Sequence, residues 1–126
     1  MSISLSHAAV MTVSLEKAVL FYQEILNLDT TPFESDPLRD GLRRCFVVGP
    51  DGQYMIELIE MPSNTHVTIP GRGAVHHLGL TVDRDWGTSI RDRLRTTQTP
   101  FREAQGKLFV RDADGLVIEI ETANNP

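Results

Sequence analysis

The stretch Gly73-Ala74-Val75-His76-His77-Leu78-Gly79-Leu80-Thr81-Val82 has the composition of a β-strand, because apolar and β-branched residues dominate it. Two adjacent histidines, His76 and His77, interrupt the apolar run. Successive side chains of a strand point to opposite faces of a sheet, so the two histidines cannot both face inward. A single inward histidine is more often a hydrogen-bonded core residue than a ligand. The ligand interpretation therefore depends on a second copy of the arrangement.

A second copy lies about 70 residues earlier, where His7 stands near the start of the apolar run 5–13. Each of these strands is followed by a helical pattern and then by extended segments. The helical patterns cover 15–26 and 86–97, and the extended segments cover 29–34, 42–48 and 54–59 in the first copy and 100–104, 107–111 and 116–121 in the second. A repeat of this length exceeds a solenoid unit and indicates two βαβββ modules.

Local signals mark where these elements begin and end. Ser14 is a candidate N-cap for the first helix, and Asn27 is a candidate C-terminal stop, because Asn tolerates the left-handed conformation. Two turns, Gly49-Pro50-Asp51-Gly52 and Asp112-Ala113-Asp114-Gly115, each precede a closing strand. The two modules therefore share a turn before the closing strand as well as their element order.

The 126 residues are expected to form one α+β domain, residues 1–126. Module 1 is predicted at about 3–61 and module 2 at about 74–123, joined by the Pro- and Gly-containing linker 62–73. The tail 124–126 is expected to be frayed.

Composition excludes several classes of protein. Hydrophobic residues make up 40% and charged residues 23%, as expected of a globular chain rather than a disordered one. The net charge of −5, without a basic patch, argues against nucleic acid or an anionic membrane as partner. No signal peptide or membrane-spanning run is visible, so a cytoplasmic location is expected. Cys45, the single cysteine, cannot form an intrachain disulfide and is a poor candidate nucleophile in its apolar strand.

Each module closes with a carboxylate between two aliphatic residues, in Ile56-Glu57-Leu58 and Ile118-Glu119-Ile120. Either these glutamates face solvent, as the nearby Glu60 and Glu121 allow, or they are buried and need a partner. A divalent cation is the partner that two Glu and two His would share, and this donor set suits Fe, Mn, Co, Ni or Zn.

Several segments carry a further resemblance that spans nearly the whole chain. They are Ser6-His7-Ala8-Ala9-Val10, Leu15-Glu16-Lys17-Ala18, Phe21-Tyr22, Ile25-Leu26-Asn27-Leu28, Ile56-Glu57-Leu58, Val75-His76-His77-Leu78-Gly79-Leu80, Arg111-Asp112-Ala113-Asp114-Gly115 and Ile118-Glu119. In these segments the chain resembles the vicinal oxygen chelate superfamily, which includes glyoxalase I, methylmalonyl-CoA epimerase, ring-cleaving dioxygenases, and fosfomycin and bleomycin resistance proteins. The resemblance implies that the modules pair into a curved, partly open, β-barrel-like sheet with the helices outside.

The resemblance also implies that His7, Glu57, His77 and Glu119 are the metal ligands, and that His76 points to the opposite face. The expected cofactor is one divalent ion, Ni, Co, Mn, Zn or Fe, with no other cofactor. With all four ligand positions filled by His or Glu, the chain resembles the glyoxalase I and epimerase branches. This resemblance implies a metal-dependent lyase or isomerase that transfers a proton next to a metal-bound carbonyl through an enediolate.

In that reaction, Glu119 and Glu57 are the expected catalytic carboxylates, with Glu119 or a metal-bound water taking the proton. Met11 and Met61 stand where glyoxalase I carries Arg and Asn, and this argues against a glutathione substrate.

Two alternatives stay open at this point. One is an Fe(II) ring-cleaving dioxygenase that uses His7, His77 and Glu119. The other is a metal-free small-molecule binding or resistance protein, in which the four side chains hydrogen-bond to one another. In every version the partner is a small molecule. Arg44 and Arg111 either face the site and receive an anionic group or are solvent-side charges. Exposed sheet edges predict a homodimer, with the site within one chain or shared by two.

Overall fold

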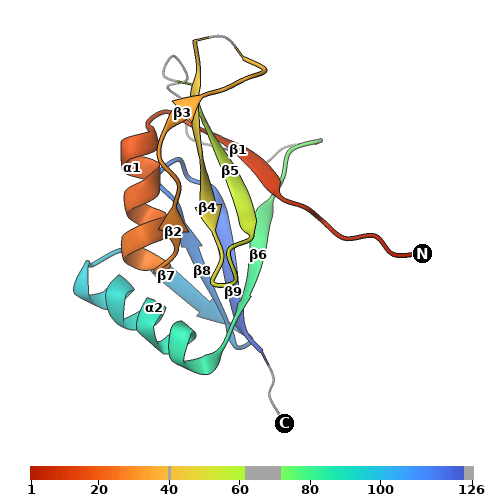
Figure 1. The fold of residues 1–126 in the computed structure, drawn as a ribbon. Coiled ribbons are helices and arrows are strands. Elements are labelled where there is room, and N and C mark those ends of the chain that lie inside the picture. Colours follow the sequence, from red (N-terminus) through yellow and green to blue (C-terminus); the bar gives the residue numbers. More distant parts are fainter. Residues whose placement is uncertain (40, 62–71, 124–126) are drawn as a thin grey trace. The chain divides into compact units, whose positions relative to one another are not determined.

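The structure is a computed structural model of the chain, and it describes residues 1–39, 41–61 and 72–123. The chain divides into two compact units, 1–66 and 67–126, and each contains its own sheet (Figure 1). Most of the predicted linker 62–73 and all of the predicted tail 124–126 lie outside the described residues. The domain and module boundaries therefore stay predictions.

Unit 1 contains a five-stranded sheet. Its strands are β1 (Ala8–Thr12), β2 (Asp29–Thr30), β3 (Glu34–Ser35), β4 (Arg43–Val48) and β5 (Tyr54–Glu60), in the order β1-β5-β4-β2 with β3 also beside β4. β1 pairs with β5 in parallel, and the other pairs are antiparallel. The single strand predicted at 29–34 is two short strands, because Pro32 has no backbone N–H for a continuous ladder.

The helix of unit 1 begins where the sequence predicts. The Ser14 side chain accepts a hydrogen bond from the backbone N–H of Lys17 and caps α1 (Leu15–Leu20). A π-helical turn, η1 (Phe21–Ile25), then replaces the expected continuation of the α-helix, with Leu26 N donating to Phe21 O at 3.4 Å. The helical segment ends at Asn27, which has the expected positive φ of 58°.

Unit 2 repeats this order with a four-stranded sheet. Its elements are β6 (His77–Val82), α2 (Arg84–Thr96), β7 (Phe101–Ala104), β8 (Lys107–Arg111) and β9 (Val117–Thr122), with strand order β6-β9-β8-β7. The β6 and β9 strands are parallel, as β1 and β5 are in unit 1. The α2 helix begins before the predicted Trp86, because Asp83 Oδ1 accepts a hydrogen bond from Trp86 N at 2.8 Å and caps it.

Each sheet has one face covered by its own helix. In unit 1, α1 packs against β4 and β5, and in unit 2, α2 packs against β9. The buried residues on these faces alternate along the strands, as side chains of a one-sided sheet must. They are Cys45, Val47, Ile56 and Leu58 in unit 1, and Leu108, Val110, Ile118 and Ile120 in unit 2. The α+β class with two βαβββ modules is thereby confirmed, the third element of module 1 being split into β2 and β3.

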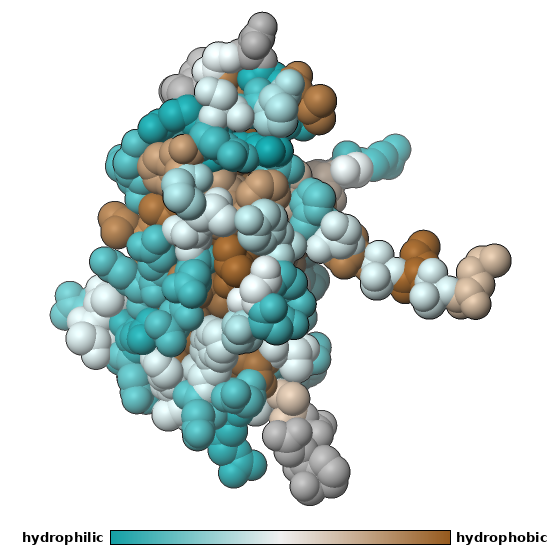
Figure 2. Space-filling view, viewed as in Figure 1, coloured by the Kyte–Doolittle hydropathy of each residue, from teal (hydrophilic) through white to brown (hydrophobic). Residues whose placement is uncertain are grey.

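The surface seen in Figure 2 is mainly hydrophilic, with hydrophobic side chains at separate points. Among the described residues, no helix combines the length and the hydropathy that a membrane span requires.

Glu60 joins the helix of unit 1 to its sheet. Its side chain is buried, and Oε2 accepts hydrogen bonds from Leu15 N at 3.0 Å and Arg43 Nη2 at 2.8 Å. Arg43 Nε donates to Oε1 at 2.9 Å. The Arg43 guanidinium holds the pKa of Glu60 below its ordinary value of 4.5, although burial opposes this shift.

We expect Glu60→Gln to lower the free energy of unfolding by about 1–2 kcal/mol at pH 7, because a charge-assisted hydrogen bond is weakened in a buried site. The lowered folded-state pKa means that the carboxylate stabilises the fold above pH 4.5 and loses this effect as the pH falls through the folded pKa. Urea unfolding at pH 7 and at lower pH tests this. The difference in the free energy of unfolding between wild type and variant should become smaller as the pH falls, and a difference that does not change with pH would contradict this prediction. Glu103→Gln, in an exposed pair with Arg91, is the control and should change stability less.

Candidate functional site

The structure brings the four predicted ligands together as two pairs, one in each unit. In unit 1, the parallel register of β1 and β5 sets Ala9 opposite Glu57. His7 lies two residues before Ala9, and its Nε2 is 3.7 Å from Glu57 Oε1. Glu57 is buried although it lies on the face away from α1, whereas His7 is partly exposed. The solvent-side interpretation of Glu57 is therefore wrong.

Unit 2 contains the equivalent pair. Here β6 and β9 set Gly79 opposite Glu119, and His77 Nε2 is 3.8 Å from Glu119 Oε2. A Cβ atom at Gly79 would lie 3.4 Å from the same carboxylate oxygen, so the glycine leaves room for Glu119. Glu119 is half-buried, and its side chain is more exposed than that of Glu57, 18% against 10%.

The spacing within each pair fits neighbouring ligands of one ion better than a hydrogen bond. Distances of 3.7 and 3.8 Å exceed the range of a direct N–H···O bond. Two atoms that each lie about 2.1 Å from an ion, roughly at right or tetrahedral angles, are about 3.0–3.4 Å apart. Small side-chain movements would therefore bring the two atoms of each pair to the separation expected of two ligands on one ion. In the described part of the chain, no group of three or more His, Cys, Asp or Glu side chains is placed to hold an ion, so each unit offers two donors.

Both carboxylates also have a basic partner from the neighbouring strand. Arg44 Nη1 donates to Glu57 Oε2 at 3.0 Å, and Arg44 Nε donates to Glu34. In unit 2, Lys107 Nζ lies 3.5 Å from Glu119 Oε1. Of the two positions considered for Arg44, the structure shows the one facing the site.

An aromatic residue stands directly beside each carboxylate. The registers pair Phe46 with Glu57 and Phe109 with Glu119. The Phe46 ring stacks on Tyr54 with centroids 4.6 Å apart and meets the His7 ring edge-on at 6.2 Å. Each open sheet face therefore carries a His, a Glu, a cation and a phenyl ring.

The sequence prediction missed three members of this set, Phe46, Lys107 and Phe109. The signal was present, since aligning Glu57 with Glu119 also aligns Arg44-Cys45-Phe46 approximately with Lys107-Leu108-Phe109. In both segments a basic residue and an aromatic residue flank one buried apolar side chain. Read as a strand, this pattern predicts that the basic and aromatic side chains share the face away from the core.

The sequence predicted that His76 points to the face opposite His77, and the structure shows the two rings in contact instead. β6 begins at His77, so strand alternation does not govern His76. The two Nδ1 atoms are 2.9 Å apart, and the rings meet edge-on with centroids 5.1 Å apart. His76 thus lies beside one of the predicted ligands.

The comparisons with known proteins identify the family. The chain belongs to the Glyoxalase/Bleomycin resistance protein/Dioxygenase superfamily, whose sequence model matches residues 4–120. The resemblance to this superfamily is thereby confirmed. A comparison with curated proteins gives no match.

Solved structures share the fold over nearly the whole chain. A glyoxylase/bleomycin resistance protein/dioxygenase domain from Frankia sp. EAN1pec is 22% identical with a TM-score of 0.81, covering 99% of this chain and 95% of that one. The Leishmania major trypanothione-dependent glyoxalase I is 22% identical with a TM-score of 0.76, covering 96% and 87%. The fosfomycin resistance protein FosX of Listeria monocytogenes, in complex with Mn(II) and sulfate, is 18% identical with a TM-score of 0.71, covering 98% and 95%. At these identities the likeness shows the fold alone.

Cys45 stays outside the site. It is fully buried on the helix-covered face of β4, and burial raises the pKa of its thiol to about 11.

We expect the native protein to react with a thiol reagent such as DTNB at pH 8 at least about 100-fold more slowly than the unfolded chain, because burial removes both access and thiolate. The rate of thionitrobenzoate release with and without denaturant measures the ratio. Comparable rates would show that Cys45 is accessible in the folded protein. Cys45→Ala provides the blank.

Proposed function

We propose that the chain is a divalent-metal-dependent lyase or isomerase that transfers a proton next to a substrate carbonyl, with His7, Glu57, His77 and Glu119 as the metal ligands. The observation that carries this proposal is the repeated His–Glu pair. Its members have equivalent registers in both units and are spaced at 3.7 and 3.8 Å. The stability of the fold does not require a His and a Glu at matched positions of two separate sheets.

The donor set fits the expected ion. Imidazole and carboxylate ligands together suit Mn, Fe, Co, Ni or Zn. When bound, the cation would supply Lewis acidity that polarises a substrate carbonyl and acidifies the neighbouring C–H bond. The family includes relatives whose structures hold a metal, such as the FosX complex with Mn(II).

Glu119 is the better candidate for the base. Glu57 accepts a 3.0 Å hydrogen bond from Arg44. Glu119 accepts none from the described residues, and its cationic neighbour Lys107 is 3.5 Å away. A less tightly held carboxylate can move to take a proton from the substrate carbon and return it to the adjacent carbon. Glu57 would then keep its place as a ligand.

A ring-cleaving dioxygenase is favoured by one specific contact. The hydrogen bond from Arg44 to Glu57 could hold this carboxylate away from the ion. His7, His77 and Glu119 would then form the two-His, one-carboxylate set typical of Fe(II) oxygenases, with open positions for oxygen and substrate.

A metal-free binding or resistance protein is favoured by the charge balance. Arg44 and Lys107 already place a cation beside each carboxylate, so neither needs a metal ion to offset its charge. In this version the open sheet faces bind a small molecule without transforming it. The homodimer and the cytoplasmic location remain predictions alongside all three versions.

Metal content tests the proposal. We expect mass spectrometry of protein purified without a metal-affinity tag to find about one divalent ion per chain. His7→Ala and His77→Ala should each weaken metal binding by at least about tenfold, because each removes a ligand. His76→Ala is the matched control: its ring touches His77 but is outside the proposed ligand set, so the ion should be retained.

The nature of the ion and a fourth variant separate the alternatives. Nickel, cobalt, manganese or zinc that is lost in Glu57→Gln supports the four-ligand lyase or isomerase. Iron that is retained in Glu57→Gln supports the dioxygenase. If the protein contains no metal and binds none on titration, the metal proposal is wrong and the metal-free binding protein is supported.

A further inference from the structure

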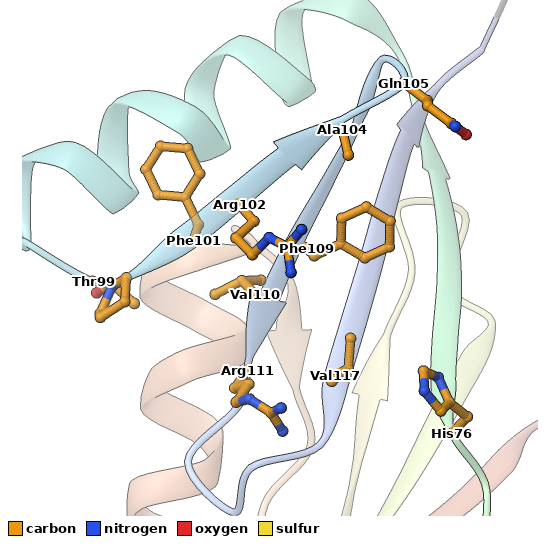
Figure 3. Close-up of a pocket in the computed structure, with 11 residues that line it drawn as sticks. His76, Thr99, Phe101, Arg102, Ala104, Gln105, Phe109, Val110, Arg111 and Val117 are labelled. Atoms are coloured by element: carbon orange, nitrogen blue, oxygen red, sulfur yellow. The ribbon is translucent and has the colours of Figure 1, made fainter. Parts of the chain in front are cut away.

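Outside the His77–Glu119 pair, unit 2 has a cavity of about 730 Å³ on its sheet. Figure 3 shows the side chains that line it, from β7 and the residues on either side of it, from β8 and β9, and from the segment before β6. The residues on which the argument rests are His76, Phe101, Arg102, Phe109, Arg111 and Val117. The volume is within the range of pockets that hold small organic ligands.

This cavity adjoins the face that carries Glu119. Arg102 pairs with Phe109, and Phe109 pairs with Glu119, so these three side chains share one face of the sheet. Arg111 pairs with Val117, which in turn pairs with His77, and this row lies on the same face. The cavity therefore continues the surface on which the unit 2 half of the candidate metal site is built.

The lining is cationic and has no acidic side chain. Arg102 and Arg111 contribute guanidinium groups, and none of the described lining residues is Asp or Glu. This contrasts with Arg39, Arg43, Arg44 and Arg91, each of which pairs with a carboxylate.

The two arginines are free to bind an anion. Arg102 has no ion pair or side-chain hydrogen bond with any described residue. Arg111 Nη1 donates to the backbone oxygen of Gly115 at 2.7 Å, which positions the guanidinium and leaves further N–H donors available. In a chain of net charge −5, two arginines without carboxylate partners in one cavity select for an anion.

The rest of the lining is mostly apolar. Phe109 and Val117 stand beside the arginines on the open face. Phe101 pairs with Val110 on the helix-covered face and reaches the cavity only at its edge, and Figure 3 shows the two phenyl rings on different sides of Arg102. Apolar walls with a few polar groups that set orientation are typical of small-molecule sites. An inorganic anion would leave these walls unused.

We propose that this cavity binds a small organic anion with an aromatic or bulky apolar body, its carboxylate held by Arg102 and Arg111. The contact between His76 and His77 connects the cavity to the His77–Glu119 pair. Anions of this kind are therefore the substrate class of the candidate site, an inference that rests on the proposed function. The binding of the anion depends only on the residues of the cavity.

Calorimetric titration of the full chain, with metal removed by chelation, tests the proposal with three probes. Phenylacetate carries both parts of the ligand, phenylacetamide lacks the charge, and acetate lacks the apolar body. We expect phenylacetate to bind at least about tenfold more tightly than either of the others, because each lacks one set of contacts. Equal affinity for acid and amide would overturn the anion site, and equal affinity for acetate would overturn the apolar part. Absence of phenylacetate binding up to about 10 mM would overturn both.

Variants assign the binding to the cavity. Arg102→Ala and Arg111→Ala should each weaken phenylacetate binding about tenfold, through loss of a charge-assisted hydrogen bond. Arg95→Ala, an exposed arginine of α2 outside the cavity, is the matched control and should bind as wild type does. Unchanged affinity in both cavity variants would overturn the proposal.

The two proposals can fail separately. A protein that binds no metal but binds phenylacetate through Arg102 and Arg111 keeps the cavity and loses the metal centre. A protein that binds metal through His77, with phenylacetate affinity indifferent to Arg102 and Arg111, does the reverse.

Discussion

The parallel pairing of the first and last strand of each unit is the constraint on which the candidate site depends. This pairing sets Ala9 opposite Glu57 and Gly79 opposite Glu119, and it brings a histidine from the start of each first strand to the carboxylate. Side chains alternate between faces with a period of two, so a shift of one residue in either register would move the carboxylate to the helix-covered face. The position of Glu57 and of Glu119 on the open face therefore follows from backbone pairing between strands.

Because each sheet has its core on one face only, the other face can carry these polar groups without placing them in the core. The helix of each unit covers one face with aliphatic side chains, and the ionisable residues gather on the other. On that face Arg44 compensates Glu57, and Lys107 lies close enough to compensate Glu119. The compensation is unequal, since only Arg44 forms a hydrogen bond. This difference separates a firmly held carboxylate from one that is freer to move, although the two occupy equivalent positions.

Much of the fold could be predicted from the sequence because its signals are local. The cap at Ser14, the left-handed Asn27 and the turns ending at Gly52 and Gly115 follow from the preferences of single residues. The recurrence of His and Glu also singled out the four residues that the structure places in two His–Glu pairs. The π-helical turn at Phe21–Ile25 was missed, because apolar spacing of three and four residues is compatible with either kind of turn.

The sequence by itself determined the order of elements, the one-sided pattern of each sheet and the choice of His and Glu at matched places, since these depend on neighbouring residues and their periodicity. Only the tertiary structure decided that Arg44 faces Glu57, that Lys107 faces Glu119, and that His76 lies against His77. Only the tertiary structure gathered Arg102 and Arg111 into a cavity without a carboxylate. These features depend on which strands become neighbours and in what register, and on where a strand begins. Pairing between distant segments sets those quantities, and no local pattern encodes it.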